Sequence, residues 1–319
     1  MAAYHDLDAR GALAERAREA AERLRECRLC PRACGADRSA DERATCGVGR
    51  RACVASAHLH FGEESPLVGT GGSGTIFFAG CNLGCCFCQN FDISHEAHPS
   101  QEVTPERLAR VMLDLQRRGA HNINLVTPSH VVAQVLEALP IAIDGGLELP
   151  LVYNSGGYDT VETLELLDGV VDIYMPDIKV RAPDVAGRFF GAPDYPEVAA
   201  AAVKEMHRQV GDLELDGDGV AVRGLLVRHL VMPEGTAGTR EWMRFLADEV
   251  SRNTYVNIMG QYHPCGLVLS RPADFPELAR PVTASEMDQA FRDADEAGIT
   301  RLDERRRRAV DLFRLLLGE

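Results

Sequence analysis

The chain has 319 residues, of which 45% are hydrophobic and 26% charged, a composition typical of globular domains. Its formal net charge of −14 argues against bulk nucleic-acid binding, which needs a basic face. No apolar run approaches the roughly 18 residues of a membrane helix. The polar N-terminal residues also lack the apolar stretch of a secretory signal. We therefore expect a cytoplasmic protein with neither nucleic acid nor membrane among its partners.

Two patterns follow one another along the chain. A helical pattern over residues 8–27 leads into a stretch rich in cysteine and arginine, and from residue 74 short apolar runs alternate with helical patterns. The predicted strands cover residues 74–80, 123–127, 151–154, 171–175, 224–232 and 255–259. The predicted helices cover residues 105–118, 130–139, 160–167, 198–210, 240–250 and 284–298.

This alternation predicts an α/β fold with a parallel sheet and right-handed crossovers. Several of the runs are apolar on both faces, as strands of a buried parallel sheet are. Six units favour a partial (β/α)6 barrel over a closed barrel of eight, with the site at the carboxyl ends of the strands. We predict this barrel, with C-terminal helices, for residues 71–319. A small helical and cysteine-rich extension, residues 1–70, precedes it.

The strongest motif is FFAGCNLGCCFCQN, which begins at Phe77 and follows the first predicted strand. Cys81, Cys85 and Cys88 are spaced as C-x-x-x-C-x-x-C. A [4Fe–4S] cluster usually takes four cysteines, so three on one loop leave one iron free to bind a small molecule. The alternatives are a structural zinc site with Cys86 as a fourth ligand, and a set of buried thiols.

This loop resembles the signature of the radical S-adenosylmethionine (SAM) superfamily. From residue 74 to about residue 263 the chain is also similar to the activating enzymes of pyruvate formate-lyase and other glycyl-radical enzymes, and nearly all of it to a branch with an N-terminal cysteine segment. The matching segments are CRLCPRACG, HFGEESPLVGTGGSGTIFFAGC, CQNFDISHE, HNINLVTPSH, VYNSGGYD, VDIYMPDIK, VRHLVMP and QYHP. The resemblance implies a [4Fe–4S] cluster on Cys81, Cys85 and Cys88 that cleaves SAM reductively, with Phe87 against the adenine.

The resemblance also implies a cofactor site at the strand ends. The matching positions are Asn154, Ser155, Asp177, Lys179, Arg228 and His263. An arginine suits the carboxylate of SAM, and Asp or Asn suits its ribose hydroxyls. Arg228 follows three apolar residues of a strand and needs a partner there. Without a cofactor, Asp177 and Lys179 would form an ordinary ion pair, and His263 would be a satisfied polar group.

One departure concerns the second strand. Many of the activating enzymes end it in a Gly-Gly-Glu turn that binds the cofactor amino group, whereas this chain has LVTPSH over residues 125–130. Thr127 or Ser129 could supply oxygen acceptors instead. Glu63 and Glu64 are a candidate pair facing the substrate, or part of a solvated loop.

A second group of cysteines precedes the predicted barrel. Cys27, Cys30, Cys34 and Cys46 are close enough in sequence for a structural zinc site or an auxiliary iron–sulfur cluster. A metal-free, reduced segment is the alternative. Cys53 departs from the pattern, and Cys265 follows His263 near the expected barrel mouth.

These features predict an activating-enzyme-like radical SAM oxidoreductase that abstracts hydrogen with a 5′-deoxyadenosyl radical. The resemblance implies a flavodoxin or ferredoxin as electron donor and a glycyl-radical enzyme as protein substrate. The alternatives are a radical SAM enzyme acting on a small molecule or another peptide residue, and a non-catalytic iron–sulfur redox or sensor protein.

Overall fold

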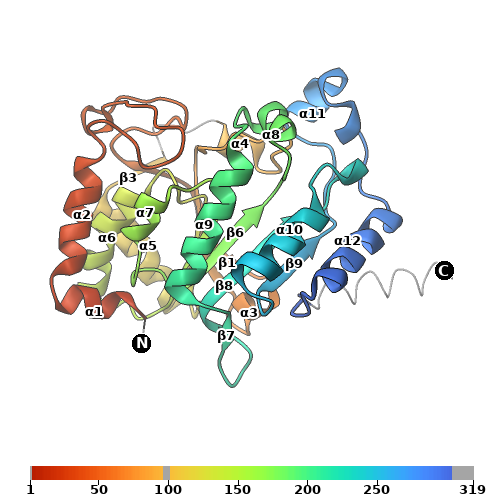
Figure 1. The fold of residues 1–319 in the computed structure, drawn as a ribbon. Helices are drawn as coiled ribbons and strands as arrows, with labels where there is room; N and C mark the ends of the chain where they lie inside the picture. Colours follow the sequence, from red (N-terminus) through yellow and green to blue (C-terminus); the bar gives the residue numbers. More distant parts are fainter. Residues whose placement is uncertain (1, 96–100, 304–319) are drawn as a thin grey trace.

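The computed structural model describes residues 2–95 and 101–303, shown in Figure 1. The last part of the predicted barrel domain, residues 304–319, lies outside this range. The strands are β1 (Ala52–His60), β2 (Ser73–Phe78), β3 (Glu102–Val103), β4 (Ile123–Val126), β5 (Leu151–Ser155), β6 (Ile173–Ile178), β7 (Glu214–Leu215), β8 (Ala221–Leu230) and β9 (Tyr255–Met259). The α-helices are α1 (Tyr4–Ala9), α2 (Ala12–Glu22), α3 (Ser65–Val68), α4 (Phe91–Ser94), α5 (Pro105–Arg117), α6 (Val132–Asp144), α7 (Val161–Glu165), α8 (Pro183–Phe190), α9 (Tyr195–Val210), α10 (Thr239–Phe245), α11 (Leu267–Ser270) and α12 (Ala284–Ala297).

The protein is a mixed α/β structure whose strands form one mostly parallel sheet. Six strands run parallel and pair in chain order, β2–β4–β5–β6–β8–β9. They correspond to the six strands predicted from the sequence. β1, β3 and β7 are added antiparallel. The sheet is not closed, because no pairing among the described strands joins β9 to β1 or β2.

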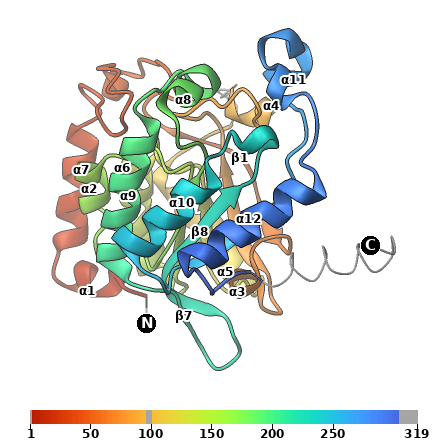
Figure 2. The same cartoon turned by 45° about the vertical axis from the view of Figure 1, so that its right-hand side comes forward.

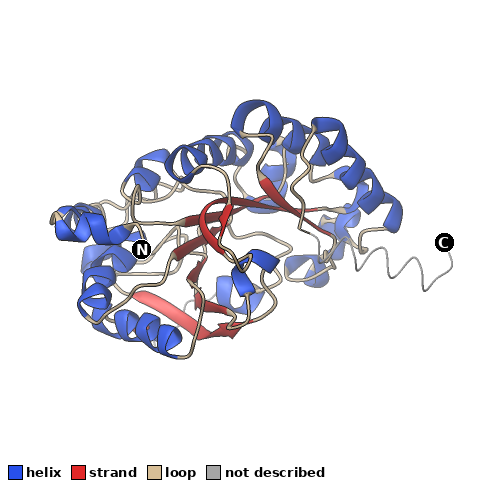
Figure 3. Ribbon diagram, turned by 90° about the horizontal axis from the view of Figure 1, so that it is seen from below, coloured by secondary structure: helices blue, strands red, loops and turns tan. Residues whose placement is uncertain are grey.

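Helices connect the parallel strands and lie mostly around the outside of the curved sheet, as Figures 2 and 3 show. Two helix starts agree with the sequence. The Thr104 hydroxyl accepts the Arg107 N–H at the start of α5, and Thr283 and Glu286 form a capping box at the start of α12. Because the strands are parallel, their carboxyl ends meet at one edge of the sheet.

The N-terminal segment differs from the prediction in two respects. The single helix predicted over residues 8–27 is wrong: α1 and α2 are separated at Gly11, whose φ of 73° is left-handed. Residues 52–60, which were not predicted as a strand, form β1 and pair with β2. In the described part of the chain no helix has both the length and the apolar character to cross a membrane.

Candidate functional site

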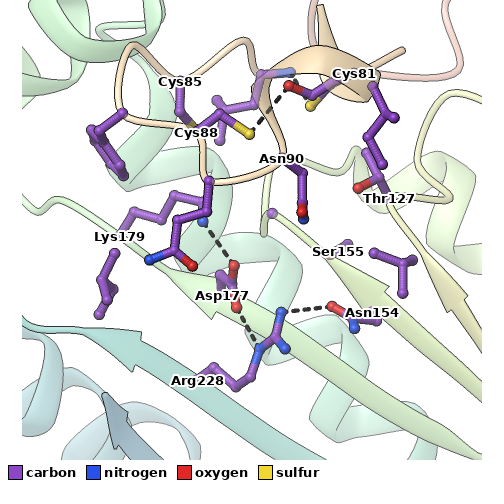
Figure 4. Close-up of a pocket in the computed structure, with 18 of the residues that line it drawn as sticks. Cys81, Cys85, Cys88, Asn90, Thr127, Asn154, Ser155, Asp177, Lys179 and Arg228 are labelled. Atoms are coloured by element: carbon purple, nitrogen blue, oxygen red, sulfur yellow. Dashed lines mark hydrogen bonds and ion pairs between the residues drawn. The ribbon is translucent and has the colours of Figure 1, made fainter. Parts of the chain in front are cut away.

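A cavity of about 240 Å³ lies at the carboxyl ends of the parallel strands (Figure 4). One side is the loop between β2 and α4, residues 79–90, which we call the cysteine loop. The other side is formed by the ends of β4, β5, β6, β8 and β9. The residues predicted for the SAM cluster and its cofactor all line this cavity except His263: Cys81, Cys85, Phe87, Cys88, Asn154, Ser155, Asp177, Lys179 and Arg228.

A hydrogen-bonded ion-pair network occupies the strand side of the cavity. Asp177 of β6 and Arg228 of β8 are register partners, and their Oδ1 and Nε atoms are 2.6 Å apart. Lys179 Nζ lies 2.7 Å from Asp177 Oδ2, and Arg228 Nη2 donates to Asn154 Oδ1 at 2.7 Å. The network joins β5, β6 and β8, so each charge on it has a partner.

The network holds its groups in their charged forms. Burial would raise the pKa of Asp177, but Arg228 and Lys179 outweigh it and lower that pKa. Burial would lower the pKa of Lys179, but Asp177, together with Cys85, raises it. A fixed ammonium group therefore stands between the cysteines and the strand ends.

The three cysteine sulfurs face the cavity from the opposite side. The Leu83 N–H donates to Cys81 Sγ at 3.3 Å, and the Ser94 hydroxyl donates to Cys88 Sγ at 3.1 Å. Burial raises the pKa of Cys81 and raises that of Cys85 well above its usual range. Metal binding would therefore have to release protons from these thiols.

The donor set of the cysteine loop fits an iron–sulfur cluster. The thiols of Cys81, Cys85 and Cys88 are soft ligands, and two of them accept hydrogen bonds of the kind that stabilise cluster thiolates. Among the described residues, no group of three or more His, Cys, Asp or Glu side chains is arranged to hold a metal ion. Cluster ligands bind different irons, so they need not converge on one point as the ligands of a single zinc ion do.

Cys86 does not line the cavity. Its side chain is 2% exposed, and its backbone carbonyl accepts the N–H of Leu267 in α11. Phe87 is also mostly buried but reaches the cavity wall. Its ring packs edge-on against Phe189 and Tyr262, with centroids 5.9 and 6.0 Å away. The alternation of neighbouring side chains thus separates Cys86 from Cys85 and Cys88.

His263 is not brought to the cavity. Its side chain is exposed, and its Nδ1 atom lies 3.2 Å from the carbonyl oxygen of Gln261. Gln261 lines the cavity instead, as do Gln89, Asn90 and Met259. Sequence reasoning missed these four. The QYHP segment indicated the right loop, but not which of its side chains faces inward.

Thr127 and Ser129, the two residues after β4 that could supply oxygen acceptors to the cofactor amino group, have different environments. Thr127 lines the cavity with a φ of 59°, a strained backbone for a β-branched residue. Its N–H donates to the Asn154 carbonyl. Ser129 is 2% exposed and hydrogen-bonds the buried carboxylate of Asp159. Thr127 is therefore the candidate in contact with a ligand.

Glu63 and Glu64 are not part of a solvated loop. The Glu63 side chain is 8% exposed, and its Oε2 lies 3.7 Å from Arg228 Nη1. Glu64 is 6% exposed and accepts a hydrogen bond from Asn257 Nδ2 at 2.7 Å. Neither carboxylate lines the cavity, so the expected contact with substrate is not seen. Glu63 instead extends the ion-pair network to the β1–α3 connection.

Glu63→Gln is expected to stabilise the protein more at pH 8 than at pH 5. Burial, opposed by Arg228 and aided by Glu64, raises the pKa of Glu63 to about 7. Because this carboxyl binds its proton more tightly when folded, its ionisation lowers the unfolding free energy as pH rises from about 4.5 to 7. The stabilisation by Glu63→Gln at pH 8 should exceed that at pH 5 by about 1–3 kcal/mol. Urea unfolding at pH 5 and pH 8 measures the two free energies, and Glu19→Gln, at an exposed position, is the control. An equal effect of Glu63→Gln at the two pH values would contradict the prediction.

The four N-terminal cysteines lie near one another in the fold, without being arranged around a metal ion. Cys27, Cys30 and Cys46 are buried and Cys34 is exposed. Burial, opposed by a hydrogen bond from the Arg32 backbone and aided by the thiols of Cys46, Cys27 and Cys34, raises the pKa of Cys30 to about 12. We call residues 27–46 the N-terminal cysteine segment. It lies beside the cysteine loop, because a Cβ atom added to Gly80 would be 2.3 Å from the Cys46 carbonyl oxygen.

Arg32 connects the two cysteine-bearing regions, and nothing in the sequence singled it out. Its guanidinium donates to four backbone carbonyls at 2.7–3.0 Å. Two belong to the cysteine loop and two to the end of α8: Asn82, Leu83, Phe190 and Gly191. The alternation of cysteine and arginine in CRLCPRACG is the sequence feature that could have indicated a role for Arg32.

Comparison with known proteins finds a relative of this chain but no matching family model. No protein-family model matches it. It is similar to a protein of Methanocaldococcus jannaschii described as uncharacterized protein MJ0674, with 30% identity over 282 residues. The alignment covers 86% of this chain and 75% of the archaeal protein. The chain therefore belongs to the same family as this archaeal protein.

Proposed function

We propose that the protein is a radical SAM iron–sulfur enzyme of the activating-enzyme type. The observation that carries the proposal is that Cys81, Cys85 and Cys88 and the charged strand ends line one cavity from opposite sides. Three thiols with no carboxylate ligand beside them favour a cluster with one open iron over a closed zinc site. In this reading the six parallel strands and their outer helices form a partial (β/α)6 barrel.

Cys81, Cys85 and Cys88 would hold the cluster, which would supply one electron, received from a reduced flavodoxin or ferredoxin, for the cleavage of SAM to methionine and a 5′-deoxyadenosyl radical. The chain's residues bind and orient the substrates. Lys179 places a positive charge beside Cys85 and offsets the negative charge of the thiolates. Asn154, Ser155 and Thr127 offer oxygens to the amino and hydroxyl groups of SAM, and Phe87 offers an apolar wall.

The radical would take a hydrogen atom from the substrate, with 5′-deoxyadenosine as the product. We propose a glycine in a glycyl-radical enzyme as the hydrogen donor, on the strength of the resemblance to activating enzymes. A small molecule or another peptide residue is the alternative. Isotope transfer distinguishes them: deuterium from a glycine-labelled partner protein appears in 5′-deoxyadenosine only in the first case.

Removing the loop thiols is expected to abolish SAM cleavage. Iron-reconstituted protein reduced with dithionite should form 5′-deoxyadenosine, and the triple variant Cys81→Ala, Cys85→Ala, Cys88→Ala should form at least about 100-fold less, because the electron source is lost. Liquid chromatography with mass spectrometry measures the product. Electron paramagnetic resonance should show a reduced-cluster signal that SAM shifts in the wild type only.

Cys86→Ala is the matched control, because Cys86 is in the same loop but does not line the cavity. This variant should keep its SAM-dependent signal and most of its activity. A wild-type signal that ignores SAM, with no 5′-deoxyadenosine, would reject the proposal. A loss of the cluster in Cys86→Ala would then identify Cys86 as its fourth ligand and the protein as an electron carrier or sensor.

A further inference from the structure

A buried guanidinium stands in the N-terminal cysteine segment without a carboxylate partner. Arg38 is 1% exposed, and within the described ranges no acidic side chain forms an ion pair with it at 4.0 Å or less. Its Nε donates to the Gly49 carbonyl at 3.1 Å and its Nη1 to the His130 carbonyl at 2.8 Å. Its Nη2 has no hydrogen-bond partner.

Such a charge is costly unless an anion lies beside it. The groups that can become anions next to Arg38 are thiols. Its Nη1 lies 3.6 Å from Cys27 Sγ, and the Cys34 Sγ atom lies 3.9 Å from the Cys27 carbonyl oxygen. The Cys30 thiol is close enough to those of Cys27, Cys34 and Cys46 for their charges to interact, and so is the Cys46 thiol to those of Cys27 and Cys34. One buried cation therefore faces a group of four cysteines.

We propose that Cys27, Cys30, Cys34 and Cys46 bind a thiolate-ligated metal centre, either one zinc ion or an iron–sulfur cluster, with Arg38 as its counter-charge. Four thiolates outweigh the charge of a divalent ion or cluster core and leave the centre negative. Arg38 then has the anion that its burial requires. Because no described group is arranged around a metal ion, binding must draw the thiols together and release their protons.

The centre has a structural role in this fold. Arg32 lies between Cys30 and Cys34 and holds the backbone of the cysteine loop. Cys46 contacts Gly80 at the start of that loop. Arg38 binds the carbonyl of His130, whose Nε2 lies 3.0 Å from the Ala79 carbonyl oxygen. Ligation of the N-terminal segment therefore restrains the loop that carries Cys81.

The test uses the full chain carrying Cys81→Ala, Cys85→Ala and Cys88→Ala, purified without oxygen. Metal bound to this triple variant cannot belong to the proposed SAM cluster, so the two proposals fail separately. Elemental analysis should find about one zinc per chain, or about four irons with visible cluster absorption after reconstitution. These two results distinguish the two kinds of centre. The proposal would be overturned if zinc and iron were both found at less than about a tenth of an equivalent per chain.

Further variants in this background test the ligands and Arg38. Cys46→Ser should lose the metal, whereas Cys53→Ala, a buried cysteine outside the ligand set, should keep it; loss in both would overturn the ligand assignment. In competition with a chelator, the Arg38→Gln protein should bind the metal about 10–100-fold more weakly than the protein with Arg38. The metal affinity of Arg38→Lys should be closer to that of the protein with Arg38. Unchanged affinity in Arg38→Gln would reject the counter-charge. Chelator competition on folded protein, verified by circular dichroism, separates metal loss from misfolding.

Discussion

Gly80→Ala is expected to lower the free energy of unfolding by about 2–5 kcal/mol and to prevent stable iron loading. Gly80 has a φ of 79°, and the added Cβ would be 2.3 Å from the Cys46 carbonyl oxygen and 3.0 Å from Val48 Cγ2. The left-handed backbone costs an alanine about 1–2 kcal/mol, and overpacking costs about 1–3 kcal/mol more. The first contact is with backbone, so no side-chain rotation can relieve it. Urea unfolding and iron content per chain measure the two effects.

Gly84→Ala is the matched control for this result. Gly84 is in the same loop with a φ of 65°, but a Cβ there would have nothing within 4 Å. Only the backbone cost remains, so we expect a loss of about 1–2 kcal/mol and near-normal iron loading. If the two variants were equally destabilised, the proximity of Cys46 to the cysteine loop would not account for the Gly80 effect.

Arg228→Met is expected to cost about 2–4 kcal/mol of unfolding free energy and to weaken SAM binding. The change removes the 2.6 Å ion pair to Asp177 and the hydrogen bond to Asn154. It leaves the Asp177 carboxylate half-compensated by Lys179, and breaking a buried pair from one side is strongly destabilising. The 18% exposure of Arg228 keeps the effect below that of a fully buried pair. Urea unfolding and equilibrium SAM binding measure the two effects.

An exposed arginine and a double variant test this explanation. Arg208 also has two acidic partners, Glu205 and Asp168, but its side chain is 57% exposed, so Arg208→Met should cost less than about 1 kcal/mol. Arg228→Met combined with Asp177→Asn should be less destabilising than the sum of the single changes, because the double variant removes both charges of this pair, whereas each single change leaves the other charge without it. Additive costs would mean that the ion pair is not the source of the effect.

Much of the frame of the site could be predicted from local sequence patterns. The six apolar runs became the six parallel strands, since runs apolar on both faces are stable only when helices cover them. In a parallel sheet the strand ends share one edge, so Asn154, Asp177 and Arg228 were expected together and line one cavity. The caps at Thr104 and Thr283 were also predictable, because capping depends on residues three positions apart.

Where the prediction failed, the outcome depended on contacts between distant segments. Residues 55–60 (ASAHLH) alternate between apolar and polar, a strand pattern that the prediction passed over, and the fold pairs residues 52–60 with β2 as β1. α6 continues through Pro140 to Asp144, beyond the predicted end at residue 139. Burial of Leu139 and Ala142, on either side of that proline, offsets the hydrogen bond that proline removes.

The sequence by itself determined the strand order, the spacing of the three loop thiols and the charges at the strand ends, because each depends on residues close together in the chain. Only the tertiary structure decided which side chains face the cavity. It turns Gln261 inward and His263 outward, and it buries Glu63 beside Arg228. It also sets Arg38 among the N-terminal cysteines. The physical reason is that burial and charge pairing are properties of packed segments, and no local pattern specifies which distant segment will supply the partner.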